Sequence, residues 1–406
     1  MVKRSDEKVI KLCEQKQCTG CAACFSVCPT NSISMQENIY SEIHPVLNTD
    51  TCIQCGLCQD VCPQIKDISF KECIKCFAGW RNDEYKRRDS SSGGIAALLY
   101  EKFLDAGYVC YGVKYNLTKG AYYTLITSTE DIDQIKGSKY VQADVGEVFK
   151  EIGRKLKENK KILFIGTPCQ VAGLENLVSV KYKKFRKNIT LIDFLCHGTV
   201  PGKYLLDEIH NIENKKKFCV DGISFRSNIS KKNYYFSLYY NNKLCYSRKA
   251  ELQPYFYGFL HSTFCRESCV ECLYKCEKRV GDVTLGDFIG LGGMDPIKIP
   301  YGINPSLVFI NSKQGENAIR LIQDESVLIE RKAAEAISGG PSFKQKNVDS
   351  NMRRKFRKLY ISGGYDYAKK RTINRKMIID FYFAKLFNYT KRVIRKVIKI
   401  MKRGKR

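Results

Sequence analysis

An α+β head, an α/β domain with a mixed sheet and a basic amphipathic C-terminal helix are the parts that the 406-residue sequence predicts. The head is indicated by two matched runs of four cysteines before residue 64. The α/β domain is indicated by strand-like and helix-like segments that alternate after residue 94. The C-terminal helix is indicated by apolar residues at helical spacing among lysines and arginines. A hydrophobic content of 44% argues against disordered and fibrous classes.

The cysteine spacing defines the chemistry of the head. Each run follows C-x2-C-x2-C-x3-C and is followed by a proline, a spacing in which three cysteines bind one 4Fe–4S cluster and the fourth binds the other. The sequence therefore predicts a ferredoxin-like dicluster head with two ligand sets. The first is Cys18, Cys21, Cys24 and Cys62, and the second is Cys52, Cys55, Cys58 and Cys28. A pair of zinc sites is the alternative, but zinc motifs pair two CxxC units across a longer gap.

The chain carries twenty cysteines, and its first residues lack the apolar core of a signal peptide. In a chain of this size, that combination indicates metal or redox chemistry rather than a disulfide framework. No stretch approaches the roughly 18 uninterrupted apolar residues of a membrane span. We therefore expect a cytoplasmic location.

Strands and helices alternate in the body of the chain. The expected helices are Ile95–Ala106 and Val145–Glu158, and the expected strands are Tyr108–Val113, Tyr122–Thr127, Lys161–Gly166, Ile189–Leu195, Val220–Phe225, Tyr234–Tyr240 and Ser306–Asn311. Buried strands with helical crossovers predict a layered α/β domain in which these strands form one mixed sheet. Ligands of such sheets bind at the carboxyl ends of the strands.

Short motifs follow one another in a fixed order along the body. They are SSSGG (90–94), KGSKYVQ (136–142), GTPCQVAGL (166–174), CHG (196–198), ISFR (223–226), SCVEC (268–272) and DVTLGDF (282–288). Together with the head, they resemble the family of coenzyme F420 hydrogenase/dehydrogenase beta subunits over roughly residues 15 to 312. The resemblance implies FAD, a 4Fe–4S cluster in the body, and two-electron exchange with a deazaflavin or a related acceptor. One departure is GDFIG at 286–290, where the family often has GDFWG.

A third cluster is expected in the body. The cysteines that match those shared by the family are Cys169, Cys196, Cys269 and Cys272, and we predict these as its ligands. The alternative is the local run Cys265, Cys269, Cys272 and Cys276, although four ligands within twelve residues are cramped around one cluster. Cys169 could instead be an inert turn cysteine, or a reactive thiol at a helix N-terminus.

Several body residues are candidates for binding the cofactor or for catalysis. Hydroxyls and free backbone N–H groups at the start of a helix suit a phosphate, which points to Ser91, Ser92, Gly93 and Gly94, unless they form an ordinary N-cap. Gly166, Thr167 and Pro168 lie at a strand end, and Lys139 is a phosphate or flavin-carbonyl partner or a surface lysine. His197 could donate a proton and Asp287 could bind a ligand, although both residues also suit structural roles.

Half of the excess positive charge lies at the end of the chain. The net charge is +27, and residues 367–406 hold fifteen Lys/Arg against one acid. Residues 361–364 read as a hinge, and apolar residues from Phe383 to Met401 recur at helical spacing beside a lysine-rich face. This pattern favours a helix lying on an anionic membrane surface, with docking on the protein's own body as the alternative. Nucleic acid is not expected as a partner, because no binding module is recognisable.

The sequence thus predicts an iron–sulfur flavoprotein oxidoreductase. Electrons would pass from a ferredoxin-like donor through 4Fe–4S clusters to FAD and on to a two-electron acceptor, either coenzyme F420-like or another substrate. Two alternatives stay open: an electron-relay beta subunit of a hydrogenase/dehydrogenase complex, and a membrane-surface reductase in polysaccharide biosynthesis. The expected domains are a two-cluster head at 1–70, the two parts of the flavin domain at 71–155 and 156–360, and the tail at 361–406.

Overall fold

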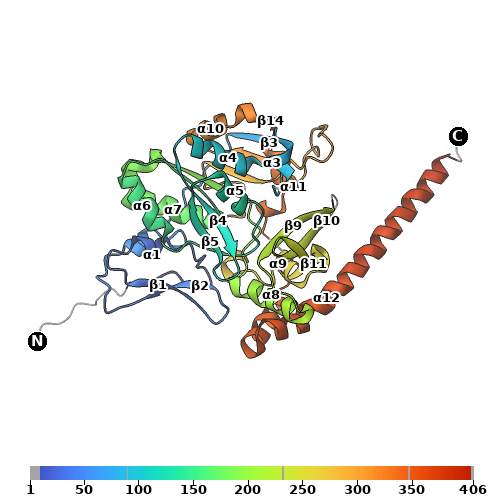
Figure 1. The fold of residues 1–406 in the computed structure, drawn as a ribbon, viewed down its shortest axis with the longest axis horizontal. Coiled ribbons are helices and arrows are strands. Elements are labelled where there is room, and N and C mark those ends of the chain that lie inside the picture. The colour runs from blue at the N-terminus through green and yellow to red at the C-terminus, as the bar shows by residue number, and fades with distance from the viewer. Residues whose placement is uncertain (1–9, 89, 231–232, 346–347, 404–406) are drawn as a thin grey trace, which may run out of the picture. The chain divides into compact units, whose positions relative to one another are not determined.

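The computed structural model describes the chain except for residues 1–9, 89, 231–232, 346–347 and 404–406. It forms two compact units (Figure 1). Unit 1 comprises residues 1–203 and 265–347, and unit 2 comprises residues 204–264 and 348–406. Among the described residues, no helix is both long enough and apolar enough to cross a membrane.

The head contains two short helices and one hairpin. They are α1 (Ala23–Val27), β1 (Ile33–Glu37), β2 (Ile43–Leu47) and α2 (Leu57–Asp60), with β1 and β2 antiparallel. The two cysteine runs share one backbone conformation, because Gly20 and Ala22 in the first run and Gln54 and Gly56 in the second all have positive φ angles. The head therefore repeats one loop, and each copy wraps its cysteines in the same way.

A nine-stranded mixed sheet forms the centre of unit 1, which confirms the predicted mixed α/β class. Its order is β14-β3-β13-β12-β8-β7-β4-β5-β6, and β4, β7, β8 and β12 run parallel. The strands are β3 (Lys75–Arg81), β4 (Val109–Asn116), β5 (Gly120–Ile126), β6 (Ala143–Asp144), β7 (Ile162–Gly166), β8 (Ile189–Phe194), β12 (Val283–Asp287), β13 (Ser306–Ile310) and β14 (Ser326–Arg331).

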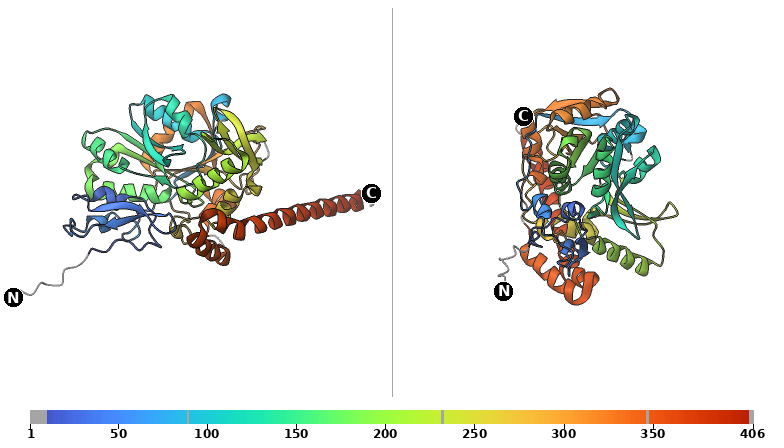
Figure 2. Two further views of the ribbon diagram at one scale, coloured as in Figure 1. Left: turned by 60° about the horizontal axis from the view of Figure 1, so that its bottom comes forward. Right: turned by 90° about the vertical axis from the view of Figure 1, so that its left-hand side faces the viewer.

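Helices cover both faces of this sheet, and successive residues of β7 show how the faces are divided. Phe164 packs with residues of α6 (Val148–Lys157) and α7 (Pro168–Lys181), in a core that also contains head residues. Leu163 packs on the opposite face with α4 (Ile95–Asp105) and α10 (Lys313–Arg320). Figure 2 shows the blue head beside the green helices of the first face. Unit 1 also contains the helices α3 (Glu84–Arg88), α5 (Thr129–Ile135) and α11 (Ala333–Gly339).

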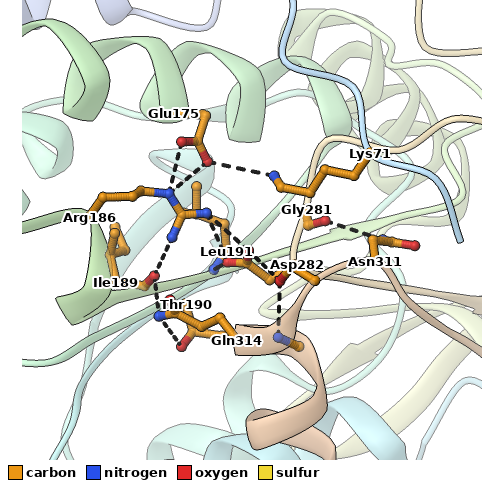
Figure 3. A network of polar contacts seen from close by, with 12 residues as sticks. Lys71, Glu175, Arg186, Ile189, Thr190, Leu191, Gly281, Asp282, Asn311 and Gln314 are labelled. Atoms are coloured by element: carbon orange, nitrogen blue, oxygen red, sulfur yellow. Dashed lines mark hydrogen bonds and ion pairs between the residues drawn. The ribbon is translucent and has the colours of Figure 1, made fainter. Parts of the chain in front are cut away.

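A polar network fixes the edge of the sheet where β8 and β12 begin (Figure 3). Asp282 accepts hydrogen bonds from Arg186, from the Leu191 N–H and from the Ser312 hydroxyl. Arg186 also bonds Glu175 of α7 at 2.8 Å, and Lys71 lies 3.7 Å from the same carboxylate. The buried charges are thus paired at one edge, while the carboxyl ends of β7, β8 and β12 lie at the opposite edge.

Two of the expected strands do not belong to the large sheet, and this part of the prediction was wrong. Residues 222–230 and 233–240 form β9 (Gly222–Ser230) and β10 (Asn233–Tyr240), which pair with β11 (Lys243–Lys249) in a separate three-stranded sheet of unit 2. Asn241 and Asn242 both have positive φ angles, as a tight hairpin between consecutive strands requires. Consecutive pairing satisfies the backbone of these strands locally, without the large sheet.

Unit 2 contains this sheet, α8 (Gly202–Lys216), α9 (Pro254–Leu260) and α12 (Ser350–Arg403). Lys369 of α12 makes a buried ion pair with Glu208 of α8 at 2.6 Å. Gly364 interrupts α12 with a φ angle of 74°, within the stretch 361–364 that was expected to be a hinge.

The second part of α12 presents an apolar row. Ile378, Tyr382 and Leu386 are exposed at helical spacing, and Phe383 beside them is 69% exposed. The expected basic face with Lys391, Arg392 and the residues that follow lies outside the residues whose side chains the structure describes.

Candidate functional site

The four cysteines expected to bind the first head cluster line one cavity. This group, called set one, consists of Cys18, Cys21, Cys24 and Cys62. Burial, together with charges on Cys62 and Cys18, raises the pKa of Cys21 to about 12. Four thiolates in a buried space repel one another, so they are stabilised by a bound cation that neutralises their negative charge. Cys13 lines the same cavity and hydrogen-bonds Cys62, which lowers the pKa of Cys62 to about 7.

The other four head cysteines line a second cavity. This group, called set two, consists of Cys28, Cys52, Cys55 and Cys58. Cys55 is exposed, and Ile53 beside it is 62% exposed, so set two lies close to the surface. Cys58 lines both cavities, which makes the two sets neighbours.

The buried side chain of Arg266 ties the first cysteine loop to the body of unit 1. The guanidinium donates to the carbonyl oxygens of Cys18 and Ile43 at 3.0 and 2.9 Å, and to Oε1 of Gln142 at 2.8 Å. Gln142 in turn donates to the carbonyl oxygen of Thr19. Arg266 also opposes the effect of burial on the pKa of Cys18. A positive charge thus lies against set one.

The body cysteines converge from three separate segments. Cys169 lies in the first turn of α7, Cys196 follows β8, and Cys269 and Cys272 lie in and after a short 3₁₀ turn at Glu267–Cys269. Burial raises the pKa of Cys196, and charges on Cys269, Cys169 and Cys272 raise it further. These four residues, Cys169, Cys196, Cys269 and Cys272, are called the body set.

The two remaining cysteines of the local run are placed differently. The Cys276 thiol donates to the carbonyl oxygens of Leu273 and Lys278, and the charges that act on its pKa come from Arg279, Asp193 and Lys278 rather than from other cysteines. Cys265 is buried against Gly198, and a Cβ added to Gly198 would lie 3.0 Å from Sγ of Cys265. The charges of the body-set cysteines therefore act on one another, and Cys276 is not part of this group.

The donor chemistry of the three sets fits 4Fe–4S clusters. In the described part of the chain, no three His, Cys, Asp or Glu side chains come close enough together to hold a single metal ion. A 4Fe–4S cluster takes one thiolate at each of its four irons, and each of the three sets offers four cysteines.

Set one and the body set are adjacent. A Cβ at Gly173 of α7 would lie 2.8 Å from Sγ of Cys21, so only glycine permits this approach of the head to the helix that carries Cys169. The charge on Cys169 also acts on the pKa of Cys21. All three cysteine sets thus follow one another within unit 1.

The loop that carries Cys272 is anchored to β8. Asp193, fully buried on this strand, accepts from the backbone N–H groups of Val280 and Gly281 and lies 3.4 Å from the guanidinium of Arg279. Arg279 donates to the carbonyl oxygen of Tyr274 at 3.1 Å. The strand therefore fixes the backbone of the cysteine loop.

The SSSGG segment meets other body motifs at the edge of the sheet. The Ser92 hydroxyl lies 2.8 Å from that of Ser306, which also accepts from the Gly93 N–H. Ser91 accepts from the N–H and the hydroxyl of Ser138. Asp287, at the end of β12, pairs in register with Ser306. Gly94 precedes α4, which has no side-chain cap. Gly94 therefore offers no side-chain acceptor to the first N–H groups of this helix.

The other candidates of the sequence analysis have structural partners. Gln170 Oε1 accepts from the Thr167 hydroxyl at 2.8 Å and from the Thr167 N–H, which fixes the turn of Gly166, Thr167 and Pro168 at the start of α7. The Lys139 ammonium donates to the carbonyl oxygens of Ile135 and Lys136. Burial lowers the pKa of Lys139 to about 7. His197 lies half-buried in the loop after Cys196.

The sequence did not single out Arg266, Tyr274 or Ser306. Arg266 and Ser306 bond partners more than a hundred residues away in the chain, and no local spacing marks such contacts. The available signal was that Arg266 and Tyr274 each lie between two cysteines of the local run.

Two stretches of the chain match the two halves of one protein family, described as "Coenzyme F420 hydrogenase/dehydrogenase, beta subunit". Residues 76–150 match its N-terminal half, and residues 159–336 match its C terminus. Together the matches span more than half of the chain. Residues 17–65 match the 4Fe-4S dicluster domain, which supports cluster binding in the head. The chain is accordingly an iron–sulfur protein.

Two of the curated relatives each match about half of the chain. An uncharacterised protein of Methanocaldococcus jannaschii is 27% identical over 224 residues, which cover 46% of this chain and 61% of the relative. A subunit of the F(420)H(2) dehydrogenase of Methanosarcina mazei is 23% identical over 213 residues, which cover 50% of this chain and 59% of the relative. The chain thus spans about three fifths of the length of these relatives.

A chain in a solved structure of the F420-reducing [NiFe] hydrogenase complex from Methanosarcina barkeri is also similar. It aligns at 16% identity with a TM-score of 0.45, over 76% of this chain and 94% of that chain. A likeness of this size is too weak to support a conclusion.

Proposed function

Because the chain belongs to the family of coenzyme F420 hydrogenase/dehydrogenase beta subunits, we propose that it is an iron–sulfur flavoprotein oxidoreductase that relays electrons from a ferredoxin-like donor to a two-electron acceptor. The acceptor is coenzyme F420-like or another substrate that takes up a pair of electrons. The observation that carries the proposal is the succession of set two, set one and the body set within unit 1.

When bound, 4Fe–4S clusters exchange single electrons and a flavin pairs two of them. The thiols of set one bind the first head cluster, those of set two bind the second, and the body set binds the third. The exposure of the cysteine sets supports a direction of electron transfer, from set two through set one to the body set. Set two includes exposed Cys55 and meets a donor at the surface beside Ile53, whereas no cysteine of set one or of the body set is exposed. Burial keeps water and oxidants away from the inner thiolates.

The proposed FAD site is the sheet edge where β7, β8 and β12 end. Two observations support it. Open α/β sheets bind ligands at the carboxyl ends of their strands, and Cys169 and Cys196 of the body set follow two of these ends. The uncapped N-terminus of α4 offers backbone N–H groups to a phosphate, beside Ser91, Ser92, Gly93 and Gly94. Lys139, Gly166, Thr167 and Pro168 remain proposed contacts, and His197 and Asp287 remain candidates for proton transfer at this edge.

An electron-relay beta subunit within a larger hydrogenase or dehydrogenase complex is the second candidate function. The Methanosarcina mazei relative is named as part of a dehydrogenase, which favours this reading. Under this proposal a partner protein of the complex takes the place of the free donor, and the three cysteine sets keep the same roles. A tight stoichiometric partner on purification would favour the relay role, whereas turnover by the isolated chain would favour the enzyme.

We further propose that the second part of α12 contacts an anionic membrane surface. The exposed apolar row of Ile378, Tyr382, Phe383 and Leu386, together with fifteen Lys/Arg in residues 367–406, supports this contact. Such a contact would also suit a reductase in polysaccharide biosynthesis.

The double variant Phe383→Ser/Leu386→Ser is expected to bind anionic phosphatidylglycerol vesicles at least about tenfold more weakly than the wild type. The reason is that it buries less apolar surface in the membrane. Vesicle co-sedimentation measures this, with exposed Tyr301→Ser in unit 1 as the control. Equal binding by both variants would rule out the apolar row as the contact.

The cofactor content of the wild-type chain tests the relay. After anaerobic purification we expect about twelve iron and twelve sulfide ions and about one FAD per chain. Iron, acid-labile sulfide and extracted flavin are each measured against protein concentration. About eight iron ions without flavin would contradict the body half of the proposal and leave only the two-cluster head.

A further inference from the structure

Tyr274 is a buried residue whose hydroxyl has no hydrogen-bond partner among the described residues. Its side chain is 4% exposed and belongs to the same core as Cys21, with Cys169 and Cys272 packed against it. The ring lies 6.3 Å from that of Phe70, measured between centroids. Within the described part of the chain, the hydroxyl oxygen makes no hydrogen bond.

Such a hydroxyl is costly in a protein interior. Leaving one buried donor unsatisfied costs about 1–3 kcal/mol, and a phenylalanine would fill the same space without that cost. Buried polar groups are otherwise almost always hydrogen-bonded, and a bound group can supply the partner that the protein does not.

The surroundings of the hydroxyl indicate which partner this is. Its core contains Cys21 of set one, and Cys169 and Cys272 of the body set pack against that core. The hydroxyl is therefore buried among cysteines of both sets, and a phenol at neutral pH donates its proton to a hydrogen bond.

The backbone around Tyr274 is held in place by charged groups. Its carbonyl oxygen accepts from Arg279, whose guanidinium pairs with fully buried Asp193 on β8. Because Tyr274 is two residues from Cys272, the anchor that fixes the phenol also fixes one ligand of the body set.

We propose that Tyr274 donates a hydrogen bond to a sulfur of the 4Fe–4S cluster held by the body set and thereby raises the reduction potential of that cluster. This inference rests on the proposed function, since it requires the body cluster. Reduction adds a negative charge to a cluster, so a donor to its sulfurs favours the reduced state. Tyr274 is thus a positioning residue that makes electron transfer from set one to the body set more favourable.

The variant Tyr274→Phe tests this role, because it removes one oxygen and keeps the ring. The body cluster is expected to become harder to reduce by about three- to tenfold in its one-electron equilibrium, where tenfold corresponds to about 59 mV. The midpoint potentials of all clusters are measured by anaerobic redox titration followed by electron paramagnetic resonance. Tyr100→Phe is the matched control, because Tyr100 is buried and donates to the carbonyl oxygen of Tyr111.

A second measurement uses the wild-type protein alone. In D2O, pulsed electron paramagnetic resonance of the reduced body cluster is expected to detect a strongly coupled exchangeable deuteron from the Tyr274 hydroxyl. Unchanged potentials in Tyr274→Phe at unchanged iron content, or no such deuteron in the wild type, would overturn the inference. A wild-type chain with only about eight iron ions would instead overturn the proposed function.

Discussion

Arg266→Met is expected to lower the stability of unit 1 by about 3–5 kcal/mol, because it removes the donors of several buried acceptors at once. The lost partners are the carbonyl oxygens of Cys18 and Ile43 and Oε1 of Gln142. Methionine fills much of the same volume without a hydrogen-bond donor, so these acceptors remain buried and unpaired. A loss of this size lowers the midpoint of thermal unfolding by on the order of 10 °C.

The same variant is expected to release iron from set one sooner than the wild type. Arg266 holds the backbone of Cys18 and places a positive charge against this set. Circular dichroism follows unfolding, and a chelator assay follows iron release. Arg266→Lys keeps the charge but loses the fork of donors, and we expect an intermediate effect. Arg320→Met, an exposed position on α10, is the surface control. An unfolding midpoint and an iron release equal to those of this control would contradict the network.

A feature of this molecule was predictable from the sequence when the residues that define it lie close together in the chain. The two cysteine runs lie within 45 residues, and their spacing alone paired Cys62 with the first run. The structure places Cys62 in the cavity of Cys18, Cys21 and Cys24. The mixed sheet was equally predictable, because β7 is a continuous apolar run and β8 is apolar at four of its six positions.

The elements that were missed depend on distant partners. β3 carries lysine and arginine at its two ends and pairs with β13 and β14, more than 200 residues away, so no local pattern marks it as a strand of the sheet. The opposite error occurred at β9 and β10, whose strand character was predictable but whose membership of a separate sheet was not. Strand propensity predicts a strand, whereas its sheet is decided by tertiary pairing.

The candidate site divides in the same way. The positions of the cysteines follow from sequence, but the adjacency of set one and the body set depends on Gly173 packing against Cys21. Likewise, Ser91 and Ser92 were expected to present their hydroxyls to a phosphate, and in the structure these hydroxyls meet Ser138 and Ser306. Hydrogen bonds between segments that are distant in the chain thus decide which hydroxyl groups stay available to bind a ligand.

Cys272→Ser and Cys276→Ser form the pair of variants that tests the ligand assignment of the body cluster. Cys272 is coupled electrostatically to Cys269 and Cys169, whereas the Cys276 thiol faces two backbone carbonyls. A serine hydroxyl is a poor substitute for a thiolate at iron, so replacing a true ligand removes its cluster. Each variant replaces one sulfur atom of the wild type by oxygen, and both positions lie in the same loop. Cys276→Ser is therefore a matched control for Cys272→Ser.

The iron content of these two variants, purified anaerobically beside the wild type, decides which cysteines hold the third cluster. We expect Cys272→Ser to keep about eight of about twelve iron ions and Cys276→Ser to keep all of them. The two head clusters should remain visible by electron paramagnetic resonance in both variants. Loss of a cluster in Cys276→Ser, or full iron content in Cys272→Ser, would contradict the assignment of the third cluster to Cys169, Cys196, Cys269 and Cys272.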